Sequence, residues 1–295
     1  MTDFKTELAG VAHAVEQALA QHLPRPAGDH AVVTKAMRYA ALGGGKRLRP
    51  FLLVEAARML GGDTDGALLA GCALECIHVY SLIHDDLPCM DDDDLRRGKP
   101  TVHKAYDEAI AVLAGDGLLT HAFALMADAR VHPDPALRLR LVAELAAASG
   151  TDGMIGGQVT DITVAEDARD TALITRLQAM KTGALIRFAT KAGGLIAAAE
   201  PHDLMALDRY ASALGLAFQI QDDILDVEGD METVGKAVGK DANLGKATFV
   251  STLGLDGAKQ KARELGQTAG AALAPYGEKA QTLLGTVDFV LERRH

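Results

Sequence analysis

The most constraining feature of this 295-residue sequence is that helix-forming residues run along nearly all of it. It is rich in Ala and Leu, has few alternating β-branched runs and contains no Trp. Ala and Leu lose little side-chain entropy in a helix, so this composition favours helices over strands. Most of the nine prolines lie between periodic apolar segments, where proline starts or stops a helix. The sequence therefore predicts an all-α fold. The expected helices are 3–22, 30–42, 50–61, 65–90, 104–130, 135–149, 151–160, 170–199, 202–228, 256–274 and 277–293.

One domain is expected over residues 1–295, because no Ser-, Gly- or Pro-rich linker divides the chain. Lys and Arg number 30 against 40 Asp and Glu, which gives a formal net charge of −10. A protein that follows nucleic-acid phosphates is usually basic, so no nucleic-acid partner is expected. An acidic enzyme that binds polyanions needs local basic clusters or metal ions instead.

The cysteine count and the apolar runs indicate the compartment. The three cysteines are an odd number without a CxxC pair, which is typical of a reducing compartment. The first ten residues lack the basic and apolar regions of a signal peptide, so a cytoplasmic location is expected. The longest apolar stretch, 66–83, is interrupted by Glu75 and His78. It predicts a buried core helix and no transmembrane segment.

An unusual acidic segment follows that stretch: six of the ten residues 85–94 are aspartates. Two carboxylates about 4 Å apart repel by roughly 4 kcal/mol at an effective dielectric constant of 20. A divalent cation relieves this repulsion, and Mg²⁺ typically uses one or two carboxylates plus substrate phosphates. Asp85 and Asp91 are six residues apart and converge only if the helix deforms between them, which Pro88 favours. The segment predicts a metal site, with a solvated acidic loop as the alternative.

A second acidic group lies near residue 222. Asp222 and Asp226 are four residues apart and share one helix face, and Gln219 lies on the same side. Apolar residues fill the gaps, so this helix is expected to be largely buried. Buried carboxylates are rarely left uncompensated. Two such motifs on separate helices are more specific for a metal site than either motif alone.

Basic residues occur in three places. The sequence GGGKRLRP at 43–50 sets cations on a Gly-rich turn before a helix, which is typical of a phosphate site. It lacks the GxxxxGK[ST] pattern and is not a nucleotide-binding P-loop. Lys181 and Thr182 lie within the predicted helix 170–199. A Gly/Lys segment at 235–246 is either part of a phosphate site or an ordinary surface loop.

Three other site classes fit less well. Glu75 and His78 match the ExxH of di-iron bundles, but the second ExxH, at 292–295, ends the chain beside two arginines. An EF-hand is excluded by Pro88 and Met90 within the acidic segment. No GxSxG motif or activated Cys nucleophile is evident.

With these motifs in place, the sequence resembles the trans-polyprenyl diphosphate synthase family, closest to its bacterial farnesyl diphosphate synthases. The resemblance runs from GGGKRLRP through HVYSLIHDDLPCMDDDDLRRGKPT, GGQ, KTGALI, FQIQDDILD and GKDANLGKAT to the terminal ERRH. Four residues between Asp86 and Asp91 match the longer, bacterial and plant form of the first motif. The resemblance implies a single-domain helical bundle around a central cavity (the isoprenoid synthase fold), a homodimer, and three Mg²⁺ ions, with Mn²⁺ as a substitute.

The resemblance also implies roles for individual residues. Asp85, Asp91 and Asp222 are expected to hold the metal ions, supported by Asp86 and Asp226. Arg96, Lys181, Thr182, Gln219, Lys236 and Lys246 are expected to bind the allylic diphosphate. Lys46, Arg49, His78 and Arg97 are expected to bind isopentenyl diphosphate. Asp85, Asp91, Lys181 and Asp222 are the expected catalytic residues.

The expected reaction condenses isopentenyl diphosphate with dimethylallyl and then geranyl diphosphate to give farnesyl diphosphate. Tyr80 and Ser81 lie five and four residues before Asp85, so Tyr80 is roughly 7.5 Å along the helix from the metal end. A bulky ring there would stop chain growth, and in the resembled family an aromatic at this position goes with the fifteen-carbon product. The alternative is that Tyr80 is only a core residue. Other open functions are a geranyl or geranylgeranyl diphosphate synthase, a terpene cyclase or head-to-head synthase, and a non-catalytic subunit.

Overall fold

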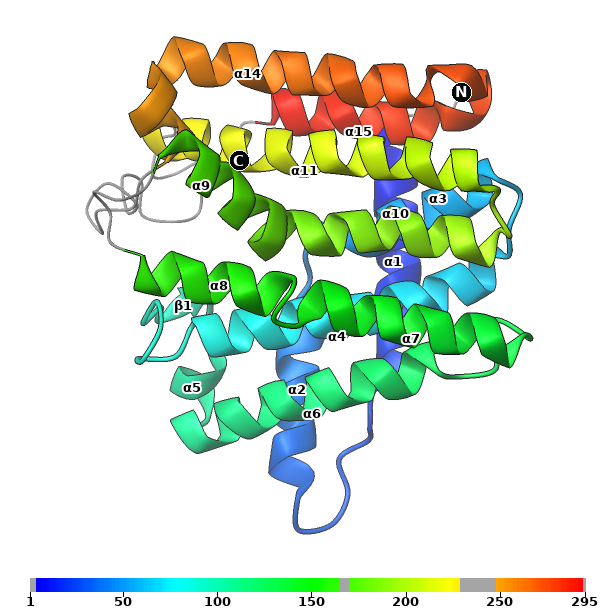
Figure 1. The fold of residues 1–295 in the computed structure, drawn as a ribbon. Helices are drawn as coiled ribbons and strands as arrows, with labels where there is room; N and C mark the ends of the chain where they lie inside the picture. The colour runs from blue at the N-terminus through cyan, green and yellow to red at the C-terminus, as the bar shows by residue number, and fades with distance from the viewer. Residues whose placement is uncertain (1–3, 165–169, 229–247, 294–295) are drawn as a thin grey trace. The chain divides into compact units, whose positions relative to one another are not determined.

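The computed structural model describes residues 4–164, 170–228 and 248–293 (Figure 1). These residues group into two compact units, 1–142 and 143–295. Helices account for most of the described residues of both units, and the one sheet among them has two strands of two residues each. The predicted all-α class is confirmed. The expected single domain around a central cavity stays a prediction.

The first unit is arranged around one long buried helix. Its elements are α1 (Phe4–His22), α2 (Ala31–Ala41), α3 (Leu48–Met59), α4 (Thr64–Asp85), β1 (Leu95–Arg96), β2 (Lys99–Pro100), α5 (Val102–Ala105) and α6 (Glu108–Met126). Helix α4 packs against α1, α2, α3 and α6, and most of its residues are buried. The strands β1 and β2 pair as an antiparallel hairpin directly after the acidic segment.

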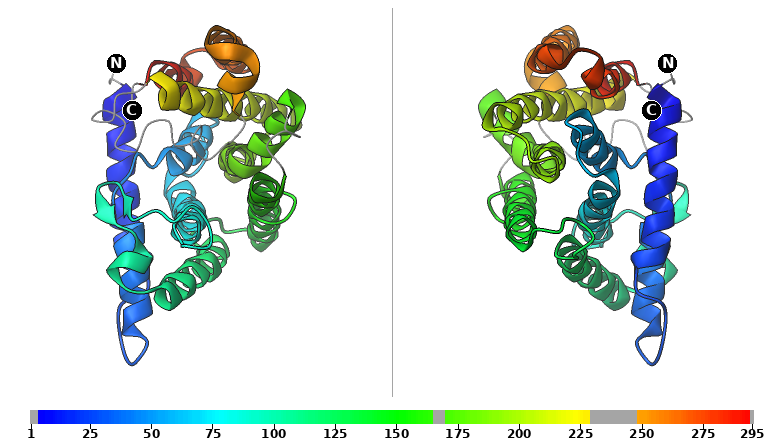
Figure 2. Two further views of the ribbon diagram at one scale, coloured as in Figure 1. Left: turned by 90° about the vertical axis from the view of Figure 1, so that its left-hand side faces the viewer. Right: turned by 90° about the vertical axis from the view of Figure 1, so that its right-hand side faces the viewer.

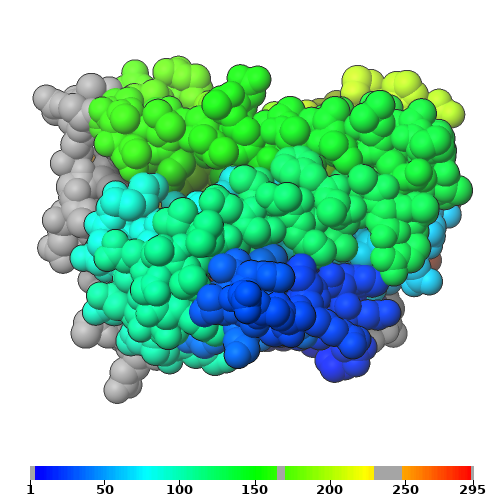
Figure 3. Space-filling model, turned by 90° about the horizontal axis from the view of Figure 1, so that it is seen from below, coloured from blue at the N-terminus to red at the C-terminus, as the bar shows by residue number. Residues whose placement is uncertain are grey.

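Among the described helices, α4 and α6 are long and apolar enough to span a membrane by length and composition. In α4, 78% of that apolar stretch is buried inside the protein, which confirms the predicted core helix. In α6 the buried share is 39%, and Val112 and Leu113 are exposed. Figure 3 shows the part of the surface where α6 lies, in teal.

The second unit has a layered helical core. After α7 (Pro135–Ser149), which continues from the first unit, its elements follow in order. They are α8 (Met154–Thr163), α9 (Thr171–Gln178), the π-helix η2 (Ala179–Gly183), α10 (Ala184–Ile196), α11 (Pro201–Glu228), α14 (Phe249–Leu273), the 3₁₀ helix η3 (Ala274–Ala280) and α15 (Gln281–Glu292). Helix α11 packs against α10, α14 and α15 (Figures 1 and 2). The buried Tyr210 hydroxyl donates to the Leu283 carbonyl at 2.7 Å and ties α15 to α11.

Several predicted boundaries were wrong for identifiable reasons. The helix expected to reach residue 90 ends at Asp85, before Pro88. The helix expected from 104 begins at Glu108, because Asp107 caps it by accepting from the Ile110 amide at 2.7 Å. The helix expected over 170–199 is interrupted by the π-helix η2.

Candidate active site

The first acidic segment folds back on the end of α4. The Asp91 amide donates to the Asp85 carbonyl at 2.8 Å, and the Met90 amide donates to the Leu87 carbonyl at 2.9 Å. This turn brings the backbones of Asp85 and Asp91 together, as the sequence predicted from Pro88. Their shared role as metal ligands stays a prediction.

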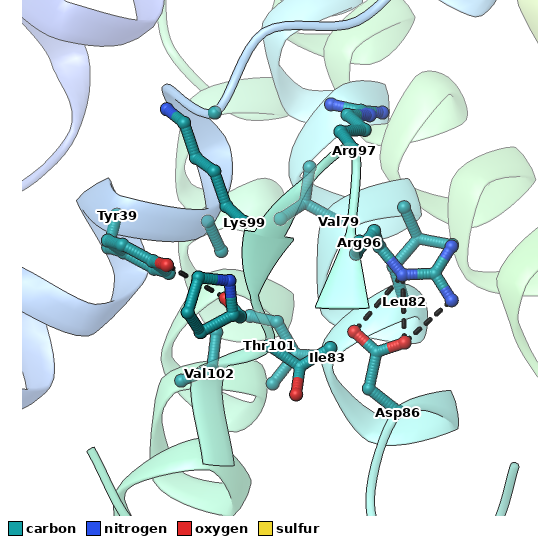
Figure 4. Close-up of a pocket in the computed structure, with 13 residues that line it drawn as sticks. Tyr39, Val79, Leu82, Ile83, Asp86, Arg96, Arg97, Lys99, Thr101 and Val102 are labelled. Atoms are coloured by element: carbon teal, nitrogen blue, oxygen red, sulfur yellow. Dashed lines mark hydrogen bonds and ion pairs between the residues drawn. The ribbon is translucent and has the colours of Figure 1, made fainter. Parts of the chain in front are cut away.

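Asp86 turns away from solvent and pairs with the hairpin. It is 3% exposed, and Arg96 donates to it from Nε at 2.8 Å and from Nη2 at 2.6 Å (Figure 4). Burial raises the pKa of Asp86, and the Arg96 guanidinium opposes that shift. The pair fixes β1 against the acidic turn. The predicted roles of Asp86 toward metal and of Arg96 toward diphosphate remain predictions.

The predicted ligands do not form a cluster of three metal-binding side chains. Among the described residues, the cluster with donor atoms within 4.8 Å of one another is Asp92, Asp94 and His103. Asp94 in that cluster pairs with Lys104 at 2.8 Å. A site built from two carboxylates and substrate phosphates needs no third side chain. The metal site at Asp85 and Asp91 stays a prediction.

The glycine-rich turn meets Arg97 of the hairpin. The Arg97 guanidinium donates to the Gly44 carbonyl, and a Cβ at Gly45 would lie 2.6 Å from the Arg97 Cζ atom. Gly45 also has φ of +130°, which disfavours other residues. Glycine is favoured at this position, because another residue would strain the backbone and meet the Arg97 guanidinium.

His78 lies within a positively charged environment. Burial, and after it the charges of Arg49 and Arg97, hold the pKa of His78 well below its usual range. A neutral imidazole offers one donor and one acceptor. Lys46, on the glycine-rich turn described above, is exposed. The charges of Arg49 and Arg97 thus act on His78. The shared role of these residues and Lys46 toward isopentenyl diphosphate stays a prediction.

A pocket in the first unit is lined in part by Arg96 and Arg97 (Figure 4). It lies between α2, the C-terminal half of α4 and the hairpin. Its wall is mainly apolar, and the side chains of Arg97 and Lys99 extend to one side of it, away from Asp86. The residues drawn are Tyr39, Ala40, Gly43, Val79, Leu82, Ile83, Asp86, Arg96, Arg97, Lys99, Pro100, Thr101 and Val102.

In the second unit, Lys181 lies on the π-helix. Its ammonium pairs with the Asp161 carboxylate of α8 at 2.6 Å. A Cβ at Gly157 would lie 2.3 Å from the Lys181 amide nitrogen, so glycine lets α8 approach the backbone. Single π turns occur frequently at functional sites. The neighbouring Thr182 is 9% exposed, so its hydroxyl is almost enclosed.

Asp161 is not among the residues predicted from the sequence. The sequence could have indicated Asp161, because this residue lies four residues after Gly157 of the GGQ motif, on the same helix face. Gln219 is joined to the same region, because its amide donates to the Gln178 side chain at 2.8 Å. Lys181, Thr182 and Gln219 thus come from packed elements of one unit.

The aspartates of the second acidic helix, α11, differ in their burial and in their partners. Asp223 is 7% exposed and accepts from the Phe249 amide at 2.7 Å, so it holds the start of α14. Asp222 is half-buried and pairs with Arg293, which lies over the Phe218 ring at 3.9 Å. Asp226 shares the face of Asp222. The roles of Asp222 and Asp226 toward metal stay predictions.

Two predicted diphosphate ligands, Lys236 and Lys246, lie outside the described residues.

Tyr80 lies inside the first unit beside His84. It is 5% exposed, and the two rings pack edge to face with centroids 5.8 Å apart. The Tyr80 hydroxyl is buried and finds no hydrogen-bond partner among the described residues. Burial, and then the charge of Asp85, raise the pKa of Tyr80 to about 12. Ser81 donates to the His78 carbonyl at 2.9 Å within its own helix.

His84 is held in place by α6. Its Nε2 atom lies 3.1 Å from the Val112 carbonyl oxygen, and a Cβ at Gly115 would lie 2.1 Å from that nitrogen. The absence of a side chain at Gly115 therefore makes room for His84. The Tyr80 ring is supported from α6 through His84.

The structure combines a mainly helical fold with an acidic turn beside the glycine-rich turn. This combination is the one expected of the family that the sequence motifs resemble. Residues 30–283 match the polyprenyl synthetase family, and the chain belongs to that family. The prediction made from the motifs is confirmed, as is the isoprenoid synthase fold.

Individual relatives share most of their length with this chain. It is 49% identical over 254 residues to the farnesyl diphosphate synthase of Geobacillus stearothermophilus, covering 84% of each chain. It is 44% identical over 296 residues to the farnesyl diphosphate synthase of Escherichia coli, covering 99% of each. A crystal structure of an FPP/GFPP synthase from Zymomonas mobilis superposes with a TM-score of 0.88 at 44% identity, covering 98% of both chains.

Proposed function

We propose that this protein is a prenyltransferase that condenses isopentenyl diphosphate with dimethylallyl and then geranyl diphosphate to give farnesyl diphosphate. The observation that carries the proposal is 44–49% identity to two bacterial farnesyl diphosphate synthases over most of the chain. The motif residues expected from the resemblance are all present in the sequence. A terpene cyclase does not need the isopentenyl site, whereas Lys46, Arg49 and His78 are present here.

The donors near the acidic turn fit a divalent metal. Asp85 and Asp91 offer carboxylate oxygens, the ligand type that Mg²⁺ prefers, and the 2.8 Å backbone hydrogen bond draws the two residues together. We assign Asp85 and Asp91 to two ions and Asp222 to a third, with Asp86 and Asp226 in support. Bound metal would neutralise charge on the departing diphosphate.

The side chains then carry the remaining steps. Lys181, Thr182, Gln219 and Arg96 hold the allylic diphosphate while its C–O bond breaks and the electron pair leaves with the diphosphate. Lys46, Arg49, His78 and Arg97 hold isopentenyl diphosphate so that its double bond attacks the allylic carbocation. A new C–C bond forms, and a proton is lost to the released diphosphate. Apolar walls exclude water, which would otherwise trap the cation.

We also propose that the enzyme acts as a cytoplasmic homodimer. The resemblance supports the dimer, and the cysteine usage supports a reducing compartment. Light scattering coupled to gel filtration should give a mass near twice the 31.0 kDa of the chain.

The proposal predicts turnover that depends on added metal. Incubation with labelled isopentenyl diphosphate, geranyl diphosphate and Mg²⁺ should release a labelled fifteen-carbon product. Chelation with EDTA should abolish turnover, and excess Mg²⁺ should restore it, because the diphosphate leaves only once its charge is neutralised. Turnover in EDTA equal to that in Mg²⁺ would exclude the proposed mechanism. Cyclised or head-to-head products would place the protein in another prenyl-transferring class.

Asp161→Asn should weaken use of the allylic substrate. The substitution keeps the shape of the side chain but removes the charge that holds the Lys181 ammonium at 2.6 Å. We expect KM for geranyl diphosphate to rise by about tenfold, because misplacing a charged group by 1 Å has effects of up to 10². Varying geranyl diphosphate at saturating isopentenyl diphosphate measures this. The matched control is Asp208→Asn, which breaks the exposed pair with Arg187 and should leave KM unchanged.

A further inference from the structure

Arg47 differs in placement from the cations around it. Lys46, one residue earlier, is exposed, and Arg49 is half-buried, whereas Arg47 is only 3% exposed. Its backbone has φ of +49° and ψ of +37°, the left-handed region that residues other than glycine rarely adopt. Arg47 therefore turns inward at the residue that caps α3, between two residues assigned to isopentenyl diphosphate.

The Arg47 guanidinium joins four elements of the first unit. Its Nη1 donates to Glu75 on α4 at 2.6 Å, and its Nη2 donates to Glu16 on α1 at 2.6 Å. The same Nη2 donates to the Ala41 carbonyl at the end of α2 at 2.5 Å. The glycine-rich turn is thereby attached to α1, α2 and α4 through one side chain.

The contact with Glu75 reaches the substrate site along α4. Glu75 is 1% exposed and lies three residues before His78, on the same side of the helix. One ion pair thus sets the distance between the helix that carries His78 and the segment in which Lys46 lies on the turn and Arg49 at the start of α3. Because Glu75 and Glu16 neutralise Arg47, its charge is balanced within the protein.

Stability alone does not account for this arrangement. A buried ion pair is often no more stable than a well-packed apolar pair, because both charges lose their hydration. Here Arg47 Nε and Glu75 Oε2 are buried without hydrogen-bond partners among the described residues. A left-handed backbone adds a further cost. These features are typical of a site where geometry is held for function.

We propose that Arg47 is a positioning residue for isopentenyl diphosphate: its ties to Glu75 and Glu16 hold Lys46, Arg49 and His78 in one diphosphate-binding geometry. This inference rests on the proposed function. Arg47 does not contact the substrate and acts through the three residues it places.

The test is Arg47→Lys, assayed by varying each substrate separately. Lysine keeps the charge but lacks the planar fork that reaches Glu75, Glu16 and the Ala41 carbonyl together. We expect KM for isopentenyl diphosphate to rise by about tenfold while KM for geranyl diphosphate stays within about twofold. Calorimetric titration with isopentenyl diphosphate alone should show the same loss of affinity.

The matched control is Arg58→Gln, in α3, the helix that Arg47 caps. Arg58 pairs with the buried Glu55, so its loss also leaves a buried carboxylate without its partner. It should lower the melting temperature without changing either KM. A milder variant, Glu16→Gln, guards against failure of Arg47→Lys to fold, because the Glu16 side chain is 34% exposed. Glu16→Gln removes the charge of only one of the two carboxylates that hold Arg47. We therefore expect KM for isopentenyl diphosphate to rise by about threefold.

The outcomes separate the two proposals. A folded Arg47→Lys protein with an unchanged KM for isopentenyl diphosphate, or with both KM values raised equally, would overturn the positioning role. If Arg47→Lys does not fold, an unchanged KM in Glu16→Gln overturns it. A wild-type protein that does not consume isopentenyl diphosphate at all would instead overturn the proposed function.

Discussion

Asp85→Ala is expected to lower turnover by about 10³-fold or more while the helical circular dichroism stays unchanged. Losing a single group that stabilises developing charge costs about 10²–10³ in rate, and a lost metal ligand removes a larger charge. The fold should tolerate the change, because Asp85 is the last residue of α4 and is only half-buried. Single-turnover assays across a range of Mg²⁺ concentrations, together with a thermal melt, measure both effects.

The control for Asp85→Ala lies in the same turn. Asp92 follows Asp91 directly, is exposed and is outside the expected ligand set. Its φ of +49° calls for a residue that tolerates the left-handed region, so Asp92→Asn is the matched change. We expect near-normal turnover from Asp92→Asn. Near-normal turnover from Asp85→Ala would refute the metal assignment.

The features predicted correctly from the sequence depend on short-range chemistry. Proline cannot continue a helix, so Pro88 indicated the deformation that brings Asp91 back to Asp85. Four-residue spacing on a helix placed Asp222 and Asp226 on one face without knowledge of the rest of the chain. The positions of these groups follow from residues within one or two turns of them.

The features missed from the sequence depend on partners far along the chain. Arg47 contacts carboxylates 28 and 31 residues away, and Asp222 contacts Arg293, 71 residues away. In the run KRLR, nothing local distinguishes the arginine that turns inward from the cations that stay near the surface. The π turn at Lys181 packs closely against Gly157 of another helix. Tertiary packing decides such details, so helix periodicity predicted the elements and not these contacts.

Tyr80→Ala is expected to shift the product from fifteen carbons to twenty or more. The Tyr80 ring is buried against His84, roughly 7.5 Å along α4 from its metal end, where it would block a growing chain. Removing the ring opens space along α4 toward the residues before it. Chromatography of the dephosphorylated products gives their carbon numbers directly. If Tyr80 is only a core residue, the variant should lose about 3–5 kcal/mol of stability and still make the fifteen-carbon product.

Tyr80→Phe distinguishes the effect of the ring from that of the hydroxyl, because it removes only the hydroxyl. Because the hydroxyl is buried and has no hydrogen-bond partner among the described residues, its removal should cost nothing and should stabilise the fold by about 1 kcal/mol. Phenylalanine keeps the ring that would stop chain growth, so the product should stay at fifteen carbons. Longer products from both Tyr80→Phe and Tyr80→Ala would mean that the hydroxyl, and not the ring, limits the chain. Longer products from Tyr80→Ala alone would place the limit in the ring, which packs against His84.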